Sequence, residues 1–406
     1  MNPTIYVLPN GIRFIHRKNN SPVVHCGINI NAGSRDEFSA ENGLAHLTEH
    51  MLFKGTAKRN AYHINNRLEN VGGELNAFTT KEETVVHATV LESDVEKAVE
   101  LIADITFRST FPEKELVKEK EVILDEINSY KDNPTEQIFD DFEKFLFAHS
   151  PVGRPILGTP ASLEKIEQEQ LKLFTEKHYR CSQMVFSFVG KTASNHINKL
   201  MHAYFSDFRT GDNHYKRTKP AAYKVFRKEE KRNNFQANCI IGNRAYSLQN
   251  NKRIGLAVLI NYLGGPASNS RLNTLLREKN GLVYTIEANY APYSDSGIVT
   301  IYFGCDKENL ERCLSLVEKE LQNLRRQTFS TVQLHRIKKQ LLGQLAIASE
   351  NGEAQMLSQA KSLIAYNKVE SLPELHARIN ALSASDLSEI ANEIFEADRL
   401  SMLVYK

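Results

Sequence analysis

Two histidines and a glutamate stand close together in the segment 43–55, at a spacing that suits a metal site. His46 and His50 are four residues apart, so on a helix they are neighbours and can bind one metal ion together. Glu49 lies within roughly 60° of His46 around the helix axis. This pattern, His-x-x-Glu-His, is the inverted form of the zinc-peptidase motif, in which the glutamate is the base that activates water.

The apolar residues of the same segment predict how such a helix would be held. Leu44, Leu47 and Met51 fall on the side opposite the histidines. That side can pack into a core, and the side that carries the histidines and the glutamate then faces a cavity. Most histidines in helices are core or surface residues, so the motif alone does not establish a metal site.

A zinc site with two histidine ligands needs a third protein ligand and keeps its fourth position for water. The best candidates lie in the charged segment 112–130, which has no Gly or Pro after Pro112 and is expected to be one long helix. Glu119 and Glu126 share a face of that helix to within about 20°. Spacing alone does not choose Glu126 over Glu119 or Glu121, and a solvated face accounts for most carboxylates of such a helix.

The sequence also contains a degenerate internal repeat. Residues 43–50 match 255–262, and residues 94–101 match 309–316. In this alignment, the positions that could carry chemistry in the first half hold other residue types in the second. His46, Glu49, His50, Glu119 and Glu126 become Val258, Asn261, Tyr262, Ile337 and Gln344. Because ligand-type residues occur in only one copy at all five positions, the repeat favours a zinc site in the first half.

The chain resembles the pitrilysin/insulinase-type metallopeptidases, most closely the half-length branch that is similar to the mitochondrial processing peptidase. Members carry His-x-x-Glu-His and a glutamate ligand about 76 residues later, a spacing that falls on Glu126. The resemblance implies that His46, His50 and Glu126 hold one Zn²⁺ per chain, with Glu49 as the general base. It also implies a supporting catalytic role for Glu119, seven residues before the ligand.

Two further segments resemble substrate-binding elements of that family. Asn76, Ala77 and Phe78, followed by Thr79, match an edge strand to which an extended peptide adds by β-pairing. Arg277 and Tyr284 match a pair that hydrogen-bonds the substrate carbonyl and stabilises its developing oxyanion. Without the resemblance, a helix-end arginine and a strand tyrosine would be the simpler interpretation.

Each half of the sequence alternates segments that are expected to be strands with amphipathic segments that are expected to be helices. Residues 23–31 and 84–90 are clear strand patterns. The pattern predicts an α+β protein of two homologous α/β-sandwich domains, each a helix-covered mixed sheet. The resemblance implies that a pseudo-two-fold relates the two domains in a clam-like arrangement.

The predicted domains are 1–208, which binds zinc and is catalytic, and 222–406, which lacks metal ligands and carries the Arg/Tyr pair. The polar segment 209–221 is the expected linker. A second loop, 149–160, is rich in Pro and Gly, but it is expected to be a surface connection and not a domain boundary.

Composition and charge exclude several classes of protein. At 406 residues, with 41% hydrophobic residues, the chain is long enough for two cores. A net charge of +2 predicts neither a nucleic-acid nor a membrane partner. The five cysteines are scattered without a Cys-x-x-Cys pair, and no signal peptide, transit segment or membrane span is evident, so a reducing, cytoplasmic location is expected.

The expected function is a zinc-dependent endopeptidase that hydrolyses unfolded peptides or short polypeptides within a dimeric chamber, for processing or for degradation. Because this chain carries both the metal motif and the Arg/Tyr pair, a homodimer is preferred over a heterodimer with an inactive partner. Whether Arg277 and Tyr284 act in cis or in trans stays open. The alternatives are a non-catalytic chamber or assembly subunit of the same fold and, more weakly, a structural zinc protein.

Overall fold

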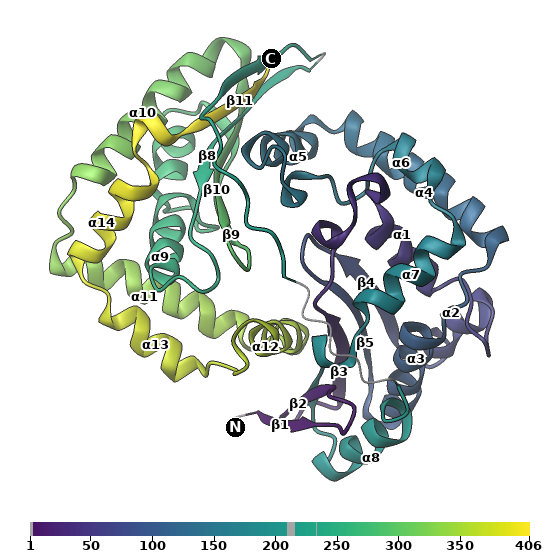
Figure 1. Ribbon diagram of the computed structural model, residues 1–406. Helices are drawn as coiled ribbons and strands as arrows, with labels where there is room; N and C mark the ends of the chain where they lie inside the picture. Colours follow the sequence, from purple (N-terminus) through teal and green to yellow (C-terminus); the bar gives the residue numbers. More distant parts are fainter. Residues whose placement is uncertain (1–2, 209–215, 233) are drawn as a thin grey trace. The chain divides into compact units, whose positions relative to one another are not determined.

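The computed structural model describes residues 3–208, 216–232 and 234–406, and it forms two compact units. The first unit comprises Met1–Ile127, Arg154–Arg217 and Ile347–Ser371, and the second comprises Asn128–Gly153, Thr218–Ala346 and Leu372–Lys406. Each unit is a β-sheet covered by helices, which confirms the predicted class of two α/β sandwiches (Figure 1). Within the described ranges, no helix has the length and apolarity needed to cross a membrane.

The sheet of the first unit has six strands in the order β1-β2-β6-β3-β5-β4. Their bounds are Thr4–Val7 (β1), Arg13–Lys18 (β2), Val23–Ile30 (β3), Glu74–Thr79 (β4), Thr84–Leu91 (β5) and Met184–Gly190 (β6). Only β2 and β6 pair in parallel, so the sheet is mixed. The strands predicted at 23–31 and 84–90 are β3 and β5, and β4 is an edge strand.

The sheet of the second unit has the same order of equivalent strands, β7-β11-β8-β10-β9. Their bounds are Arg227–Glu230 (β7), Gln236–Arg244 (β8), Val283–Pro292 (β9), Gly297–Asp306 (β10) and Ser401–Tyr405 (β11). Here β7 and β11 form the parallel pair. Strands β11, β8, β10 and β9 take the places of β6, β3, β5 and β4, which confirms the internal repeat seen in the sequence.

The helices of the two halves follow one another in a similar order, except that α8 of the first half has no equivalent after β11. In the first half they are α1 (Leu44–Leu52), α2 (Ala61–Glu69), α3 (Val95–Arg108), α4 (Glu113–Asp132), α5 (Pro134–Leu146), α6 (Pro160–Lys165), α7 (Gln168–His178) and α8 (Ser194–Phe205). In the second half they are α9 (Arg253–Gly264), the π-helix η6 (Asn273–Glu278), α10 (Leu310–Arg326), α11 (Thr331–Ala348), α12 (Gly352–Tyr366), α13 (Leu372–Ala381) and α14 (Ala384–Ile394).

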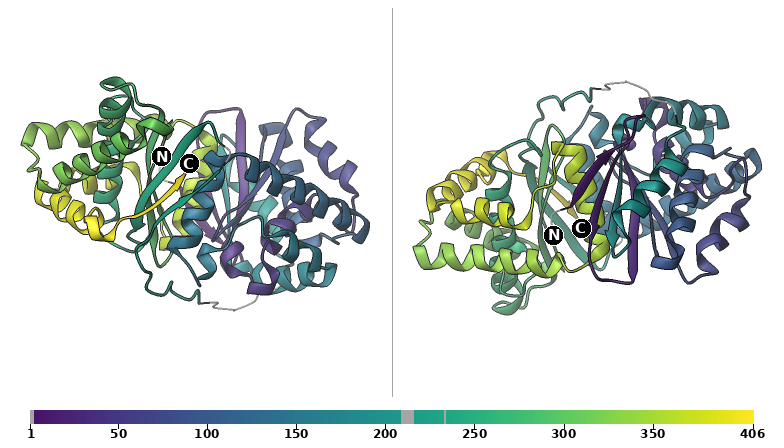
Figure 2. Two further views of the ribbon diagram at one scale, coloured as in Figure 1. Left: turned by 90° about the horizontal axis from the view of Figure 1, so that it is seen from above. Right: turned by 90° about the horizontal axis from the view of Figure 1, so that it is seen from below.

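The two faces of each sheet are covered differently, because successive residues of a strand point to opposite faces. In the first unit, Cys26 and Ile28 of β3 and Phe186 and Phe188 of β6 belong to a large apolar core that also includes residues of α1 and α3. The intervening residues face the other side, where a single helix, α12, packs on β3 and β6. Most helices of a unit therefore lie on one face of its sheet (Figures 1 and 2).

One helix of each half of the sequence packs on the sheet that the other half forms, and so belongs to the unit of that sheet. Helix α5 comes from the first half but lies beside the second sheet (Figure 1). Its residues Ile138, Phe142 and Leu146 pack in one apolar cluster with residues of β8, β10 and β11. Helix α12 comes from the second half, but Ala360 and Leu363 pack with residues of β2 and β6. Since α5 and α12 occupy equivalent places in the repeat, the exchange is reciprocal.

Because of this exchange, the prediction of two continuous domains, 1–208 and 222–406, is wrong for two segments of the chain. Segments 128–153 and 347–371 belong to the units opposite to those that their position in the sequence predicts. The reason is that an amphipathic pattern shows that a helix has an apolar face but does not show which sheet covers that face.

The loop 149–160 also differs from its prediction as a simple surface connection. The chain passes from the second unit to the first between Gly153 and Arg154, and Val152 is fully buried. For the predicted linker 209–221, residues 209–215 lie outside the described residues, and the units divide between Arg217 and Thr218. Arg217 is held on the first unit by Asp36, with nitrogen–oxygen distances of 2.9 and 2.8 Å.

Candidate active site

Helix α1 carries the His-x-x-Glu-His motif, and a buried carboxylate fixes its first turn. Glu37 accepts hydrogen bonds from the backbone N–H groups of Gly43 (3.1 Å) and Ala45 (2.7 Å), which have no partner within the helix. Gly43 has a φ of 97°, and a Cβ there would lie 2.8 Å from the carbonyl oxygen of Leu157, so the turn requires glycine. Burial raises the pKa of Glu37 to about 8, although the hydrogen bonds that its carboxylate accepts act to lower that pKa.

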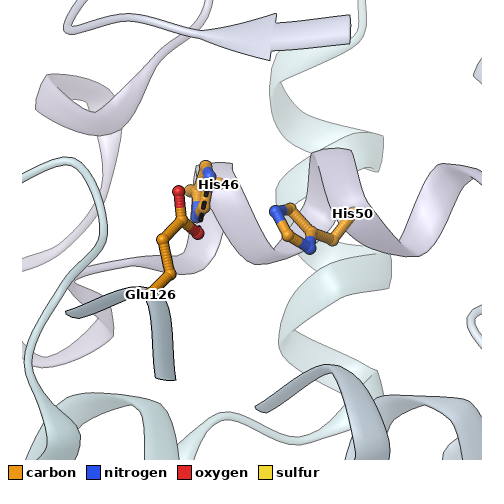
Figure 3. Close-up of side chains that lie close together, drawn as sticks. All are labelled: His46, His50 and Glu126. Carbon is orange, nitrogen blue, oxygen red and sulfur yellow. Dashed lines mark ion pairs between the residues drawn. The ribbon is translucent and has the colours of Figure 1, made fainter. Parts of the chain in front are cut away.

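The structure brings the two histidines of α1 together with Glu126 of α4 (Figure 3). One ligand atom from each of His46, His50 and Glu126 lies within 4.8 Å of the other two. The imidazole centroids are 4.6 Å apart, and Nε2 of His46 lies 3.9 Å from Oε2 of Glu126. Within the described part of the chain, no other group of three His, Cys, Asp or Glu side chains has such spacing.

The residues of this group fit a zinc ion. Two imidazoles and one carboxylate are a common catalytic ligand set, and they leave a fourth tetrahedral position for water. Ligand atoms at about 2 Å from one ion lie about 3.3 Å apart, which side-chain adjustments can reach from the observed spacing. Burial, reinforced by His50, lowers the pKa of His46 to about 3, so its imidazole is neutral at neutral pH, the form that binds a metal.

The apolar side of α1 packs as the sequence predicts. Leu44, Leu47 and Met51 are buried in the core of the first unit. His46 is buried as well, whereas His50 and Glu126 are half-buried. Burial raises the pKa of Glu126, and the neighbouring His50 opposes that shift. The ligand group is therefore open to solvent on one side and backed by the core on the other.

Glu119 lies outside the ligand group and contacts one of its members, His50. Its carboxylate lies 3.1 Å from Nδ1 of His50 and 2.7 Å from Nζ of Lys54, and the residue is buried. A carboxylate on Nδ1 orients the ring and leaves Nε2 as the ligand nitrogen. For His46 the support differs, since its buried Nδ1 has no hydrogen-bond partner in the described residues.

Glu119→Gln is expected to weaken metal binding about 10–100-fold without unfolding the protein, because the amide keeps the shape of the side chain but loses its charge. Competition between the protein and a chromophoric chelator measures the affinity. Glu115→Gln is the matched control on the same helix, where Glu115 pairs with Lys118 near the surface. Equal affinity for wild type and Glu119→Gln would show that Glu119 does not support the ligands.

Glu49 lies beside the ligand group but is not part of it. Its Oε2 accepts a hydrogen bond of 2.8 Å from the hydroxyl of Thr79, at the end of β4. Burial raises the pKa of Glu49, the Thr79 hydroxyl and His50 oppose that shift, and Glu126 adds to it. A buried carboxylate with a raised pKa, next to a metal site, has the properties of a general base.

Strand β4 provides an open sheet edge next to this group. It pairs with β5 on one side, with Asn76 opposite His87 and Phe78 opposite Val85. No strand of the described residues pairs with its other side. Asn76 and Phe78 are exposed, whereas Ala77 is half-buried. Unpaired backbone groups along such an edge can accept an extended peptide as an additional strand.

The Arg/Tyr pair lies in the second unit, so the structure does not join it to the ligand group within one unit. Arg277 belongs to η6 and Tyr284 to β9, the edge strand that is equivalent to β4. Arg277 is exposed, and Tyr284 is 77% exposed. Among the described residues, neither side chain has a polar partner, so both can donate hydrogen bonds to a ligand.

The sequence did not predict two contacts with α1: those of Glu37 with the first turn of the helix, and that of Thr79, the last residue of the matched edge-strand segment, with Glu49. Glu37 stands in a polar stretch before the helix, where nothing distinguishes a capping carboxylate from a solvated one. For Thr79 the sequence did contain a signal. Thr79 lies two residues after Ala77 in β4, so strand alternation places both side chains on the face of the sheet that is turned toward α1.

The sequence of this chain is similar to peptidase family models and to proteins named as zinc proteases. A family model described as Insulinase (Peptidase family M16) matches residues 13–160, and a model described as Peptidase M16 inactive domain matches residues 165–341. The uncharacterized zinc protease YmxG of Bacillus subtilis is 32% identical over 403 residues, which are 98% of this chain and 97% of that protein. An uncharacterized zinc protease of Rickettsia bellii is 32% identical over 400 residues, with coverage of 98% and 96%.

Solved structures show the same fold. A structure described as the peptidase M16 inactive domain from Pseudomonas fluorescens aligns with a TM-score of 0.91 at 21% identity, covering 100% of this chain and 98% of that one. A protease from Helicobacter pylori aligns with a TM-score of 0.91 at 20% identity, covering 100% and 99%. With a full-length relative that is 32% identical and with family models that match both halves, the chain belongs to peptidase family M16, the pitrilysin/insulinase-type metallopeptidases.

Proposed function

We propose that this chain is a zinc-dependent endopeptidase that hydrolyses unfolded peptides or short polypeptides. The observation that carries the proposal is the convergence of His46, His50 and Glu126 within 4.8 Å, with the carboxylate of Glu49 beside them. The relatives named as uncharacterized zinc proteases support the same activity. A structural zinc protein is disfavoured, because structural sites usually fill all four ligand positions, often with Cys.

Each residue has a separate role in the proposed reaction. His46, His50 and Glu126 hold Zn²⁺, which when bound polarises the substrate carbonyl and lowers the pKa of a water molecule. Glu49 accepts the proton of the attacking water and passes it to the leaving amine. Glu119 keeps the ring of His50 oriented. Arg277 and Tyr284 are proposed to donate hydrogen bonds to the substrate carbonyl oxygen as negative charge develops there.

The open edge of β4 limits the class of substrate. A peptide that pairs with Asn76, Ala77 and Phe78 must present an extended backbone, and a folded protein rarely has a free strand to offer. Pairing of this kind reads the backbone more than the side chains, so we expect activity on unstructured peptides of varied sequence.

The activity is tested by incubating the purified chain with unstructured peptides of roughly 10–30 residues, a length range that covers one or a few extended strands. Cleavage that a chelator abolishes is expected. An absence of cleavage from protein that binds zinc would refute the proposal that this chain is a peptidase without another subunit, and would indicate a missing partner. An absence of both cleavage and bound zinc would replace the proposal with the non-catalytic chamber subunit.

We also propose that two copies of the chain form the chamber, with the Arg/Tyr pair of one copy serving the other. An equal mixture of Glu49→Gln and Tyr284→Phe proteins tests this. Each variant alone should be at least about 100-fold less active than wild type. If the pair acts in trans, random exchange of subunits restores about one quarter of the sites.

The same mixture would stay inactive if Tyr284 acts within its own chain, because every site then contains one altered residue. Prior unfolding and joint refolding of the two variants ensures that subunits exchange. A wild-type sample taken through the same procedure controls for losses on refolding. Recovery well above the sum of the two separate variants therefore supports the trans arrangement, and no recovery rejects it.

A further inference from the structure

Thr79 connects the open edge strand to the proposed general base. It is the last residue of β4, and its hydroxyl donates a hydrogen bond of 2.8 Å to Oε2 of Glu49. Because Asn76, Ala77 and Phe78 precede it directly, the same short strand contains both the proposed peptide-binding residues and the donor that holds the base.

The backbone of Thr79 is fixed by the neighbouring strand β5 and by the turn that joins β4 to β5. Thr79 pairs with Thr84 at the start of β5, and Thr84 donates a hydrogen bond of 2.9 Å to the carbonyl oxygen of Ala32. The turn between the two strands is closed by Thr80, whose N–H donates to the carbonyl oxygen of Glu83 at 2.8 Å and whose hydroxyl accepts from the Glu83 N–H at 3.0 Å. The branched side chain of Thr79 therefore projects from a fixed point, with few accessible rotamers.

The hydrogen bond distinguishes the two oxygens of Glu49. Oε2 is occupied by the Thr79 hydroxyl, whereas Oε1 has no hydrogen-bond partner among the described residues. A carboxylate turns readily about its terminal bond, so a single fixed donor selects one orientation from a broad, two-fold distribution. Oε1 is thereby left as the oxygen that can accept a proton.

We propose that Thr79 is a positioning residue of the peptidase reaction, which fixes Oε2 of Glu49 so that Oε1 faces the attacking water. Thr79 is also the last residue of the strand to which we propose that a peptide adds. The strand that binds the substrate therefore also provides the hydrogen bond that orients the base. This inference rests on the proposed function.

Substitution of Thr79 by valine and by serine separates the hydroxyl from the rest of the side chain. Thr79→Val keeps the branched shape and removes the donor, so we expect kcat to fall about 10–100-fold with KM within about threefold of wild type, because misplacement of a catalytic group costs this much. Thr79→Ser keeps the donor and should hold kcat within about threefold of wild type. Bound zinc and Tm should be the same in all three proteins. If the valine variant loses zinc or melts earlier, Thr79→Ala takes its place in the comparison.

A second comparison asks whether Thr79 acts on the base or on the substrate. In the Glu49→Gln background, where turnover is blocked, the Kd of a fluorescein-labelled peptide that wild type cleaves should be unchanged by adding Thr79→Val. Wild-type kcat in Thr79→Val, an equal loss in Thr79→Ser, or a weaker peptide Kd in the double variant would each overturn the proposal. A wild-type chain that cleaves no peptide would instead refute the proposed function, before any variant is compared.

Discussion

Glu49→Gln is expected to lower kcat about 10²–10⁴-fold and to leave one zinc bound per chain. Glu49 lies beside the ligand group but contributes no ligand atom to it, and its Oε2 is held by the Thr79 hydroxyl. Glutamine keeps the size of the side chain and can accept the same hydrogen bond, but its amide cannot take up the proton of the attacking water. The expected loss is the usual contribution of a general base.

The measurement combines steady-state cleavage of an unstructured peptide with zinc analysis of the same preparation. Glu41→Gln is the matched control, because Glu41 lies in a short 3-10 helix ahead of α1 and no buried residue belongs to that helix. Retained zinc with lost turnover assigns Glu49 to the chemical step. Full activity in Glu49→Gln would remove it from the mechanism, and lost zinc would make it a ligand.

Glu126→Ala should abolish stoichiometric zinc binding and with it all cleavage. Glu126 provides the single carboxylate of the ligand group, and its removal leaves two imidazoles that cannot complete a three-ligand site. Glu121→Ala is the matched control, since Glu121 is an exposed residue of the same helix α4. The control should keep wild-type zinc content and activity.

Thermal unfolding gives a readout for Glu126 that does not depend on activity. A ligand that binds only the folded state stabilises it by about 4 kcal/mol at a free concentration of 1,000 times its Kd. Zinc should therefore raise the Tm of wild type and of Glu121→Ala but not that of Glu126→Ala. A zinc-dependent Tm shift in Glu126→Ala that equals the wild-type shift would show that the third ligand lies elsewhere.

The local parts of the site could be predicted from the sequence, because helix periodicity fixes them. His46, Glu49 and His50 share one turn of one helix, and the buried Leu44, Leu47 and Met51 fall opposite them. The third ligand could not be chosen in this way. Several glutamates of α4 share its surface, and the choice depends on how α4 crosses α1, which only the family resemblance supplied before the structure placed Glu126 next to the histidines.

The parts that depend on tertiary packing were missed or misplaced. Helices α5 and α12 were expected in the domains of their own half, whereas each packs on the sheet that the other half forms. Their amphipathic patterns are satisfied equally well by either sheet, so no local signal distinguishes the two arrangements. Glu37 and Thr79 act through contacts with α1 that periodicity does not encode, although the alternation of β4 does indicate the face on which Thr79 lies.

The most direct test of the account is a zinc titration of metal-free protein, followed by the initial rate of cleavage of one unstructured peptide. With the ligand group of His46, His50 and Glu126 as the catalytic centre, the rate should rise from zero and reach its plateau at one zinc per chain. Cleavage at full rate by the metal-free chain, or zinc bound at one equivalent with no cleavage of any peptide by the chain alone, would contradict the account.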